Sequence, residues 1–126
     1  MDKKEALKIV RQYGDELKNL PDHFKKDKEI VLAAIVLSGT ALGYADDSLK
    51  KDREFILEVV KQDGHVLDYT DVSFKKDKEI VLEAIKKIGG RALEYADVSL
   101  KKDPEILAAA EDEEKRTEEN QPDYYE

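Results

Sequence analysis

Residues 52–64 read Asp52-Arg53-Glu54-Phe55-Ile56-Leu57-Glu58-Val59-Val60-Lys61-Gln62-Asp63-Gly64, and this stretch decides the fold. The aspartate at its start can accept hydrogen bonds from the free amides of a helix's first turn, and Glu54 adds negative charge at the same positive end. Apolar residues recur at helical spacing through 55–60. Gly64 suits a left-handed C-terminal cap. The stretch therefore predicts an α-helix of about three turns between the aspartate and the glycine.

The same unit recurs every 25 residues, so that an aspartate lies twelve residues before a glycine in four successive copies. The pairs are Asp2 and Gly14, Asp27 and Gly39, Asp52 and Gly64, and Asp77 and Gly89. Gly90 adds one residue, so a fifth copy begins at Asp103, where Pro104 takes the first helical position that proline favours. A period of this kind is typical of repeat arrays, whose units stack and bury their cores against one another.

Each copy also carries a shorter second segment. The apolar residues of 80–85 cover roughly 200° of the first helix, which is wide enough for a neighbour on either side. After the glycine, a Leu-x-Tyr group predicts a second helix of one to two turns, followed by an Asp-x-Ser turn and one apolar residue before a lysine pair, where we expect a single helical turn. Such short connections predict an all-α fold, a short α-solenoid of about four and a half two-helix repeats, rather than a long up-and-down bundle.

The charge divides the chain into two parts. The net charge is −8, and residues 111–126 hold eight acidic and two basic residues, or −6, which leaves −2 for residues 1–110. We therefore expect a helical repeat array over 1–110, with copies starting near 2, 27, 52, 77 and 103. An acidic C-terminal extension, helical and then disordered, is expected over 111–126. The nearly neutral array lacks the excess positive charge of a nucleic-acid binder, so no nucleic-acid partner is expected.

The composition bears on the compartment. The chain contains no cysteine, which excludes disulfides, thiolate metal sites and cysteine nucleophiles. Its N-terminus leads into no apolar signal region, and no window approaches the roughly 20 apolar residues that cross a bilayer. We expect a soluble, cytoplasmic protein with no membrane partner.

The repeat unit resembles a known family. The unit runs from Leu49 to Gly64 and continues into the group of Leu67, Tyr69 and Asp71. It is similar to the tandem helical repeat family called domain of unknown function four-one-one-six, strongly over 24–110 and weakly in the first copy. The resemblance implies tandem helical repeats, with no established activity, cofactor or catalytic residue.

The residues that could carry chemistry are few. His23 and His65 occupy different repeat positions, and neither has a second histidine within a turn, whereas a metal site needs several converging ligands. The aspartates Asp46, Asp71 and Asp97 could line up to hold a hard cation, although helix capping is the favoured interpretation. The sequence contains no phosphate-binding or nucleophile motif. We expect no catalytic residue, no cofactor and no metal, and hence not an enzyme.

Two rows of side chains should run along the stack. The first is made of lysine pairs, which are Lys25 and Lys26, Lys50 and Lys51, Lys75 and Lys76, and Lys101 and Lys102. These could form a strip for an anionic partner, but a solvated face paired with acidic neighbours is favoured. The second row is Tyr44, Tyr69 and Tyr95. Tyrosine is enriched at interfaces, and the alternative, which is favoured, is that each ring packs between repeats.

One apolar pair is not required by the repeat. Val36 and Leu37 stand where other copies carry Lys61 and Gln62 or a pair of lysines, so they predict a contact patch. The leading hypothesis is a non-catalytic helical-repeat module that binds a protein or peptide. Its candidate contacts are Val36, Leu37, Tyr44, Tyr69 and Tyr95. The alternative is an electrostatic binding module that uses the acidic tail or the lysine rows, and an enzyme is a remote third.

Overall fold

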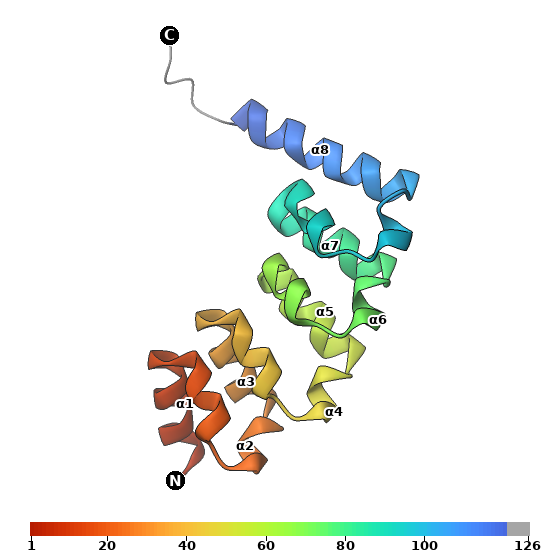
Figure 1. Cartoon of the computed structure of the whole chain (residues 1–126). Coiled ribbons are helices and arrows are strands. Elements are labelled where there is room, and N and C mark those ends of the chain that lie inside the picture. The colour runs from red at the N-terminus through yellow and green to blue at the C-terminus, as the bar shows by residue number, and fades with distance from the viewer. Residues whose placement is uncertain (121–126) are drawn as a thin grey trace.

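The long helices stack side by side along the chain. The computed structural model describes residues 1–120, with side chains described through Asp112. Figure 1 shows the stack as a curved array with α1 at one end and α8 at the other. The long helices are α1 (Lys3–Gln12), α3 (Lys28–Leu37), α5 (Arg53–Gln62), α7 (Lys78–Ile88) and α8 (Pro104–Asn120). The protein is an all-α solenoid built from the predicted repeats, and the disordered end expected for the extension falls in 121–126, outside the described residues.

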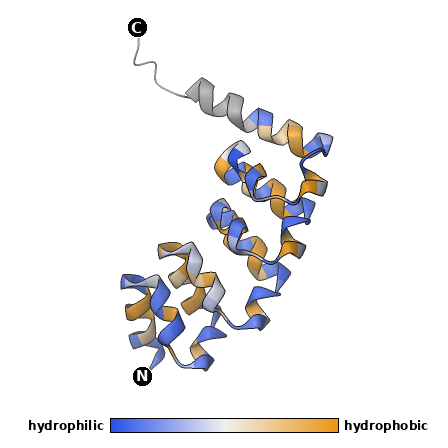
Figure 2. Cartoon of the chain, viewed as in Figure 1, coloured by the Kyte–Doolittle hydropathy of each residue, from blue (hydrophilic) through white to orange (hydrophobic). Residues whose placement is uncertain are grey.

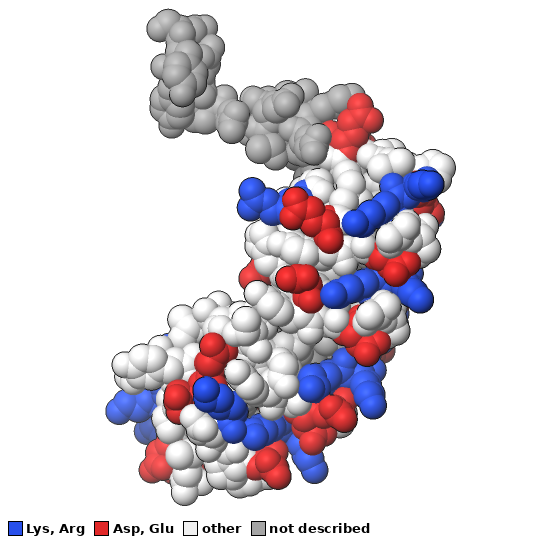
Figure 3. Space-filling model, in the orientation of Figure 1, with Lys and Arg blue, Asp and Glu red and all other residues white. Residues whose placement is uncertain are grey.

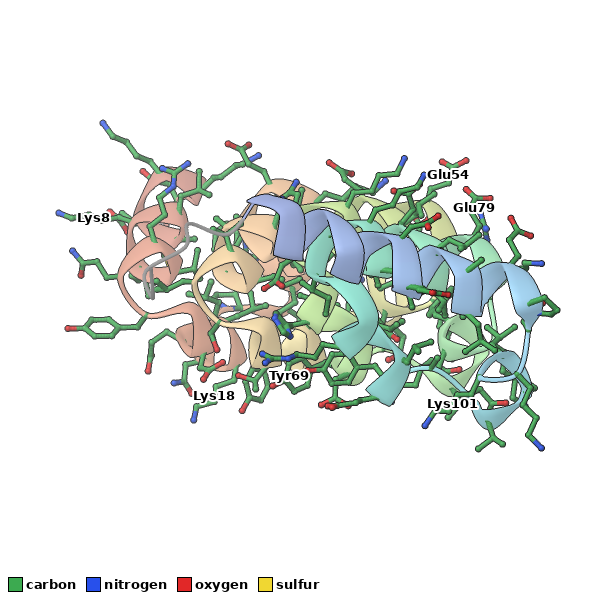
Figure 4. All side chains as sticks on the ribbon, turned by 90° about the horizontal axis from the view of Figure 1, so that it is seen from above. Lys8, Lys18, Glu54, Tyr69, Glu79 and Lys101 are labelled. Atoms are coloured by element: carbon green, nitrogen blue, oxygen red, sulfur yellow. The ribbon has the colours of Figure 1, made fainter. Side chains whose placement is uncertain are left out.

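Two shorter segments follow each of the first four long helices. The predicted second helix is a six-residue 3₁₀ helix, as seen in η1 (Gly14–Asn19), η2 (Gly39–Tyr44), η3 (Gly64–Tyr69) and η4 (Gly89–Glu94). The predicted helical turn is present as α2 (Asp22–Lys25), α4 (Asp47–Lys50), α6 (Val72–Lys75) and the 3₁₀ turn η5 (Val98–Leu100). In Figure 4, Glu54 and Glu79 of the long helices lie on one side of the array, and Lys18, Tyr69 and Lys101 of the short segments or their ends lie on the other.

Aspartate caps begin every long helix, as predicted. The carboxylate of Asp2 accepts a hydrogen bond from the Glu5 amide at 2.9 Å, and Asp52 accepts one from the Phe55 amide at 3.2 Å. The same bond, from the amide three residues on, recurs at Asp27, Asp77 and Asp103. Because each cap satisfies amides that no helical carbonyl can reach, the aspartate fixes where the helix begins.

The prediction of a left-handed cap at Gly64 is wrong. Asp63, the residue that follows α5, has an extended conformation, and the described glycine with positive φ is Gly89, at 75°. Gly64 is needed for packing instead. A Cβ placed on it would lie 2.9 Å from the carbonyl oxygen of Ala84 in the next repeat, closer than a real Cβ approaches. The absent side chain therefore lets successive repeats approach closely.

The core runs through the stack without a break. Figure 2 shows apolar residues along the long helices and polar residues over much of the short segments and ends. The predicted broad apolar face is confirmed in α7, where Ile80, Val81, Ala84 and Ile85 are buried. Among the described residues, no buried side-chain nitrogen or oxygen atom lacks a hydrogen-bond partner. The interior is therefore filled by packed apolar side chains, and most polar side chains lie at the surface.

Candidate functional site

The predicted apolar pair lies on the surface. Val36 and Leu37 are in the last turn of α3, with 71% and 52% of their areas exposed. The same helix buries Ile30, Val31 and other residues against the core. The core is therefore complete without this pair, and a contact role for it stays a prediction.

Each of the three predicted tyrosines contacts the preceding repeat. The ammonium group of Lys18 lies 6.0 Å from the ring centre of Tyr44. The ring of Tyr69 packs against the backbone at Gly39, and the hydroxyl of Tyr95 is 3.1 Å from Nδ1 of His65. These contacts agree with packing between repeats, although Tyr44 and Tyr69 keep exposed surface.

The second aspartate series caps the short helical turns. The carboxylates of Asp46, Asp71 and Asp97 each accept a hydrogen bond at 2.9 Å from the amide of the serine two residues further on. Hydrogen bonds from that serine lower the pKa of each carboxyl below its ordinary value, and lysines from the lysine pairs lower it further. Within the described part of the chain, no group of three or more acidic or histidine side chains could hold a metal ion.

The lysine pairs are accompanied by acidic side chains. Lys25 lies 3.7 Å from Asp22, and Lys50 lies 3.6 Å from Asp47. Figure 3 shows basic and acidic side chains interleaved along the edge of the array. This arrangement agrees with the favoured interpretation, a solvated and internally paired face.

We call the contact between successive repeats a junction, with repeats 1 to 4 beginning at Asp2, Asp27, Asp52 and Asp77. At three junctions, the basic residue that follows a cap pairs with both the cap and the glutamate of the next helix. These pairs are Lys3 with Asp27 and Glu29 (3.1 and 2.9 Å), Arg53 with Asp77 and Glu79 (2.6 and 3.2 Å), and Lys78 with Asp103 and Glu105 (3.2 and 2.7 Å). At the junction of repeats 2 and 3, the described ion pair of Lys28 is with Asp52 alone, at 3.7 Å.

A backbone hydrogen bond also distinguishes the junction of repeats 2 and 3 from the junctions on either side of it. The Asp46 amide donates to the Lys25 carbonyl at 3.0 Å, and the Asp97 amide donates to the Lys75 carbonyl at 3.0 Å. These bonds join repeat 1 to repeat 2, and repeat 3 to repeat 4. Within residues 1–112, the equivalent bond from Asp71 to Lys50 is not formed. Between its long helices the junction of repeats 2 and 3 is therefore looser than its neighbours, and between its short segments it lacks this backbone hydrogen bond.

We attribute the looser contact between the long helices to the size of one buried side chain. Val59 stands at the repeat position that Ala34 and Ala84 occupy in α3 and α7. A Cβ on Gly14 would lie 2.4 Å from the Ala34 carbonyl oxygen, whereas a Cβ on Gly39 would first meet the Tyr69 ring, at 3.1 Å. Because Val59 is bulkier than alanine, α3 and α5 approach less closely than α1 and α3 do.

Two grooves lie at this junction, one on each of its faces. The groove between the long helices has a volume of about 220 Å³ and is lined by Leu32, Ile35, Val36, Val59, Gln62 and Asp63. The groove beside the short segments has a volume of about 290 Å³ and is lined mainly by polar residues that include Lys50, Lys51, Asp47 and Asp71. In Figure 3 the left outline of the molecule is indented between its lower and its upper part.

The structure thus places one predicted contact, Val36, in an apolar groove, and Leu37 follows it in the chain. The tyrosines are not gathered there, since Tyr69 lines the polar groove and Tyr95 contacts His65. Sequence reasoning missed the groove itself. The available signal was Val59, a branched residue where the flanking copies carry alanine.

This architecture defines a helical-repeat protein of the solenoid class. A family model described as "Domain of unknown function (DUF4116)" matches residues 2–50, 27–75, 52–101 and 77–110, and the chain belongs to this family. Each of the first three matches spans two successive repeats, including the first copy, for which only a weak resemblance was expected. No curated protein and no solved structure matches the chain. Among the described residues, no helix has the length and apolar character needed to cross a membrane.

Proposed function

We propose that this protein is a non-catalytic interaction module that binds another protein or a peptide through the surface around Val36 and Leu37. One observation carries the proposal. Two neighbouring apolar side chains, 71% and 52% exposed, occupy a position where other repeats carry lysine, arginine or glutamine. Covering an exposed valine or leucine stabilises a complex by about 1.5–3 kcal/mol when burial is complete. The stack itself gains little from either side chain.

The titratable groups support a role without catalysis. The carboxyls with a lowered pKa are helix caps, and the basic groups with a raised pKa are their ion-pair partners. General acid–base chemistry instead needs a group within a cleft whose pKa is moved toward neutrality. The perturbed groups of this chain hold the ends of helices together.

A double substitution taken from the chain's own repeats tests the proposal. The variant V36K/L37Q gives repeat 2 the residues of repeat 3, Lys61 and Gln62, and so fits the fold. The immobilised intact chain should retain a set of proteins from its native cells, and the variant should lose it. The matched control is V98K, because Val98 is also 71% exposed but lies in η5. If V36K/L37Q and the wild type capture the same proteins, the proposed surface is wrong.

A further inference from the structure

The end of α3 differs electrostatically from the ends of α1, α5 and α7. The carbonyl groups at the C-terminal end of a helix carry partial negative charge, which a basic side chain in the last turn compensates. Such residues are present in α1 as Arg11, in α5 as Lys61 and in α7 as Lys86 and Lys87. The last turn of α3 has none, because Val36 takes the equivalent position.

Carboxylates flank this same end. Asp15, from the preceding repeat, accepts hydrogen bonds from the hydroxyl groups of Ser38 and Thr40 at 3.1 and 2.8 Å, just beyond the end of α3. Asp63 lines the groove on the opposite side, and its Oδ1 accepts a hydrogen bond from the His65 amide at 2.9 Å. Both carboxylates are therefore held in place by the fold. Lys61 lies in the last turn of α5, two residues before Asp63.

The groove between them accepts an apolar group. Leu32 and Ile35 of α3 face Val59 of α5 across it, and Val36 forms an exposed rim. Its volume of about 220 Å³ is several times the roughly 30 Å³ of a water molecule, so it has room for a large side chain. The looser junction provides this space.

We propose that this groove binds a partner segment that presents one large aliphatic or aromatic side chain next to a lysine or arginine. The proposal rests on the interaction function proposed above and names the partner's chemistry. The apolar side chain enters between α3 and α5 and covers Val36. The basic residue lies at the C-terminal end of α3, near Asp15 and Asp63, where it supplies the charge that α1, α5 and α7 carry themselves. The two carboxylates at this end of α3 favour a basic segment over a neutral or acidic one.

A random peptide library displayed on phage and selected against the intact chain tests this chemistry. The enriched peptides should share a leucine, isoleucine, phenylalanine or tryptophan within a few residues of a lysine or arginine. A synthetic peptide of that sequence should bind V36K/L37Q at least tenfold more weakly than the wild type, and V98K should bind it as the wild type does. Failure to enrich peptides, or equal binding to V36K/L37Q, overturns the proposed groove.

A second variant tests the basic residue separately. Asparagine can replace each carboxylate as a hydrogen-bond acceptor, so D15N/D63N removes charge while keeping the local bonds. We expect this variant to bind the peptide about three- to tenfold more weakly and with less dependence on salt. D68N is the matched control, because Asp68 is an exposed carboxylate of η3 outside the groove. If peptides without basic residues are enriched, and V36K/L37Q abolishes their binding while D15N/D63N does not, the partner chemistry is wrong and the interaction function stands.

Discussion

The junction of repeats 1 and 2 and the junction of repeats 2 and 3 are built from the same unit, yet they differ in tightness. In the first, a glycine lies directly on the backbone of Ala34, and Lys3 makes two short ion pairs. In the second, Val59 replaces the alanine, Lys28 keeps one long ion pair, and grooves open on both faces. Small departures from a repeat can thus create a surface feature without altering the fold.

Adding a methyl group at Gly14 or at Gly39 should give the largest difference in stability between the two junctions. A Cβ at Gly14 would lie 2.4 Å from a backbone oxygen, whereas at Gly39 it would lie 3.1 Å from the movable ring of Tyr69. Gly14→Ala should therefore lower the free energy of unfolding by about 3 kcal/mol, and Gly39→Ala by less than about 1 kcal/mol. Urea denaturation followed by circular dichroism measures both. Equal losses would show that the two junctions are equally tight.

Enlarging an alanine at a tight junction should have a smaller effect. Ala84 is fully buried in α7, and Gly64 lies against its carbonyl oxygen. Ala84→Val, which copies the residue at position 59, should lower the free energy of unfolding by about 2 kcal/mol through overpacking. Thermal and urea unfolding provide the measurement. A loss below about 0.5 kcal/mol would remove side-chain size as the reason for the loose junction.

The acid sensitivity of the chain should depend on a cap at a tight junction. The hydrogen bond from Arg53 holds the pKa of Asp77 below its ordinary value of 3.8. A carboxyl with a lowered folded pKa contributes stability that is present above the unfolded pKa and is lost as the pH falls through the folded pKa. Arg53→Ala should therefore lower the melting temperature at neutral pH by a few degrees, and this deficit should shrink as the pH falls below about 4.

Lys28→Ala is the matched control, since Lys28 occupies the same repeat position and lies 3.7 Å from Asp52. It should change the melting temperature less than Arg53→Ala does at neutral pH. Scanning calorimetry across the acid range compares the two variants. If the deficit of Arg53→Ala stays constant with pH, its contact with Asp77 does not act through the charge of the carboxyl.

Local features of the fold were predictable from the sequence. The helix starts follow from aspartates whose carboxylates reach amides only two or three residues away. The repeat period predicts the stacking because each unit needs neighbours to cover its apolar face. The role of Gly64 was not predictable from its own unit, since the atom that it must avoid belongs to Ala84 in the next repeat.

The candidate site, too, was only partly predictable from the sequence. Val36 and Leu37 could be selected because they depart from the residues of the other copies. The groove could not, because it depends on how far Val59 separates two helices that are 25 residues apart in the chain. The position of Asp15 beside Ser38 likewise depends on a contact across 23 residues. Comparison of the copies therefore finds the unusual residue, and packing decides what surrounds it.

Replacing the apolar pair, Val36 and Leu37, should have the smallest effect on stability. Unlike the changes above, it should raise the free energy of unfolding slightly rather than lower it. Lysine is a better helix former than valine, and a cation in the last turn of α3 stabilises the helix by about 0.3–1 kcal/mol. The variant V36K/L37Q should therefore unfold at the same urea concentration as the wild type or slightly above it. A loss of more than about 1 kcal/mol would instead assign Val36 and Leu37 to the core. If V36K/L37Q is at least as stable as the wild type but no longer binds the partner, then the wild-type residues favour binding over stability. This is expected of a functional surface.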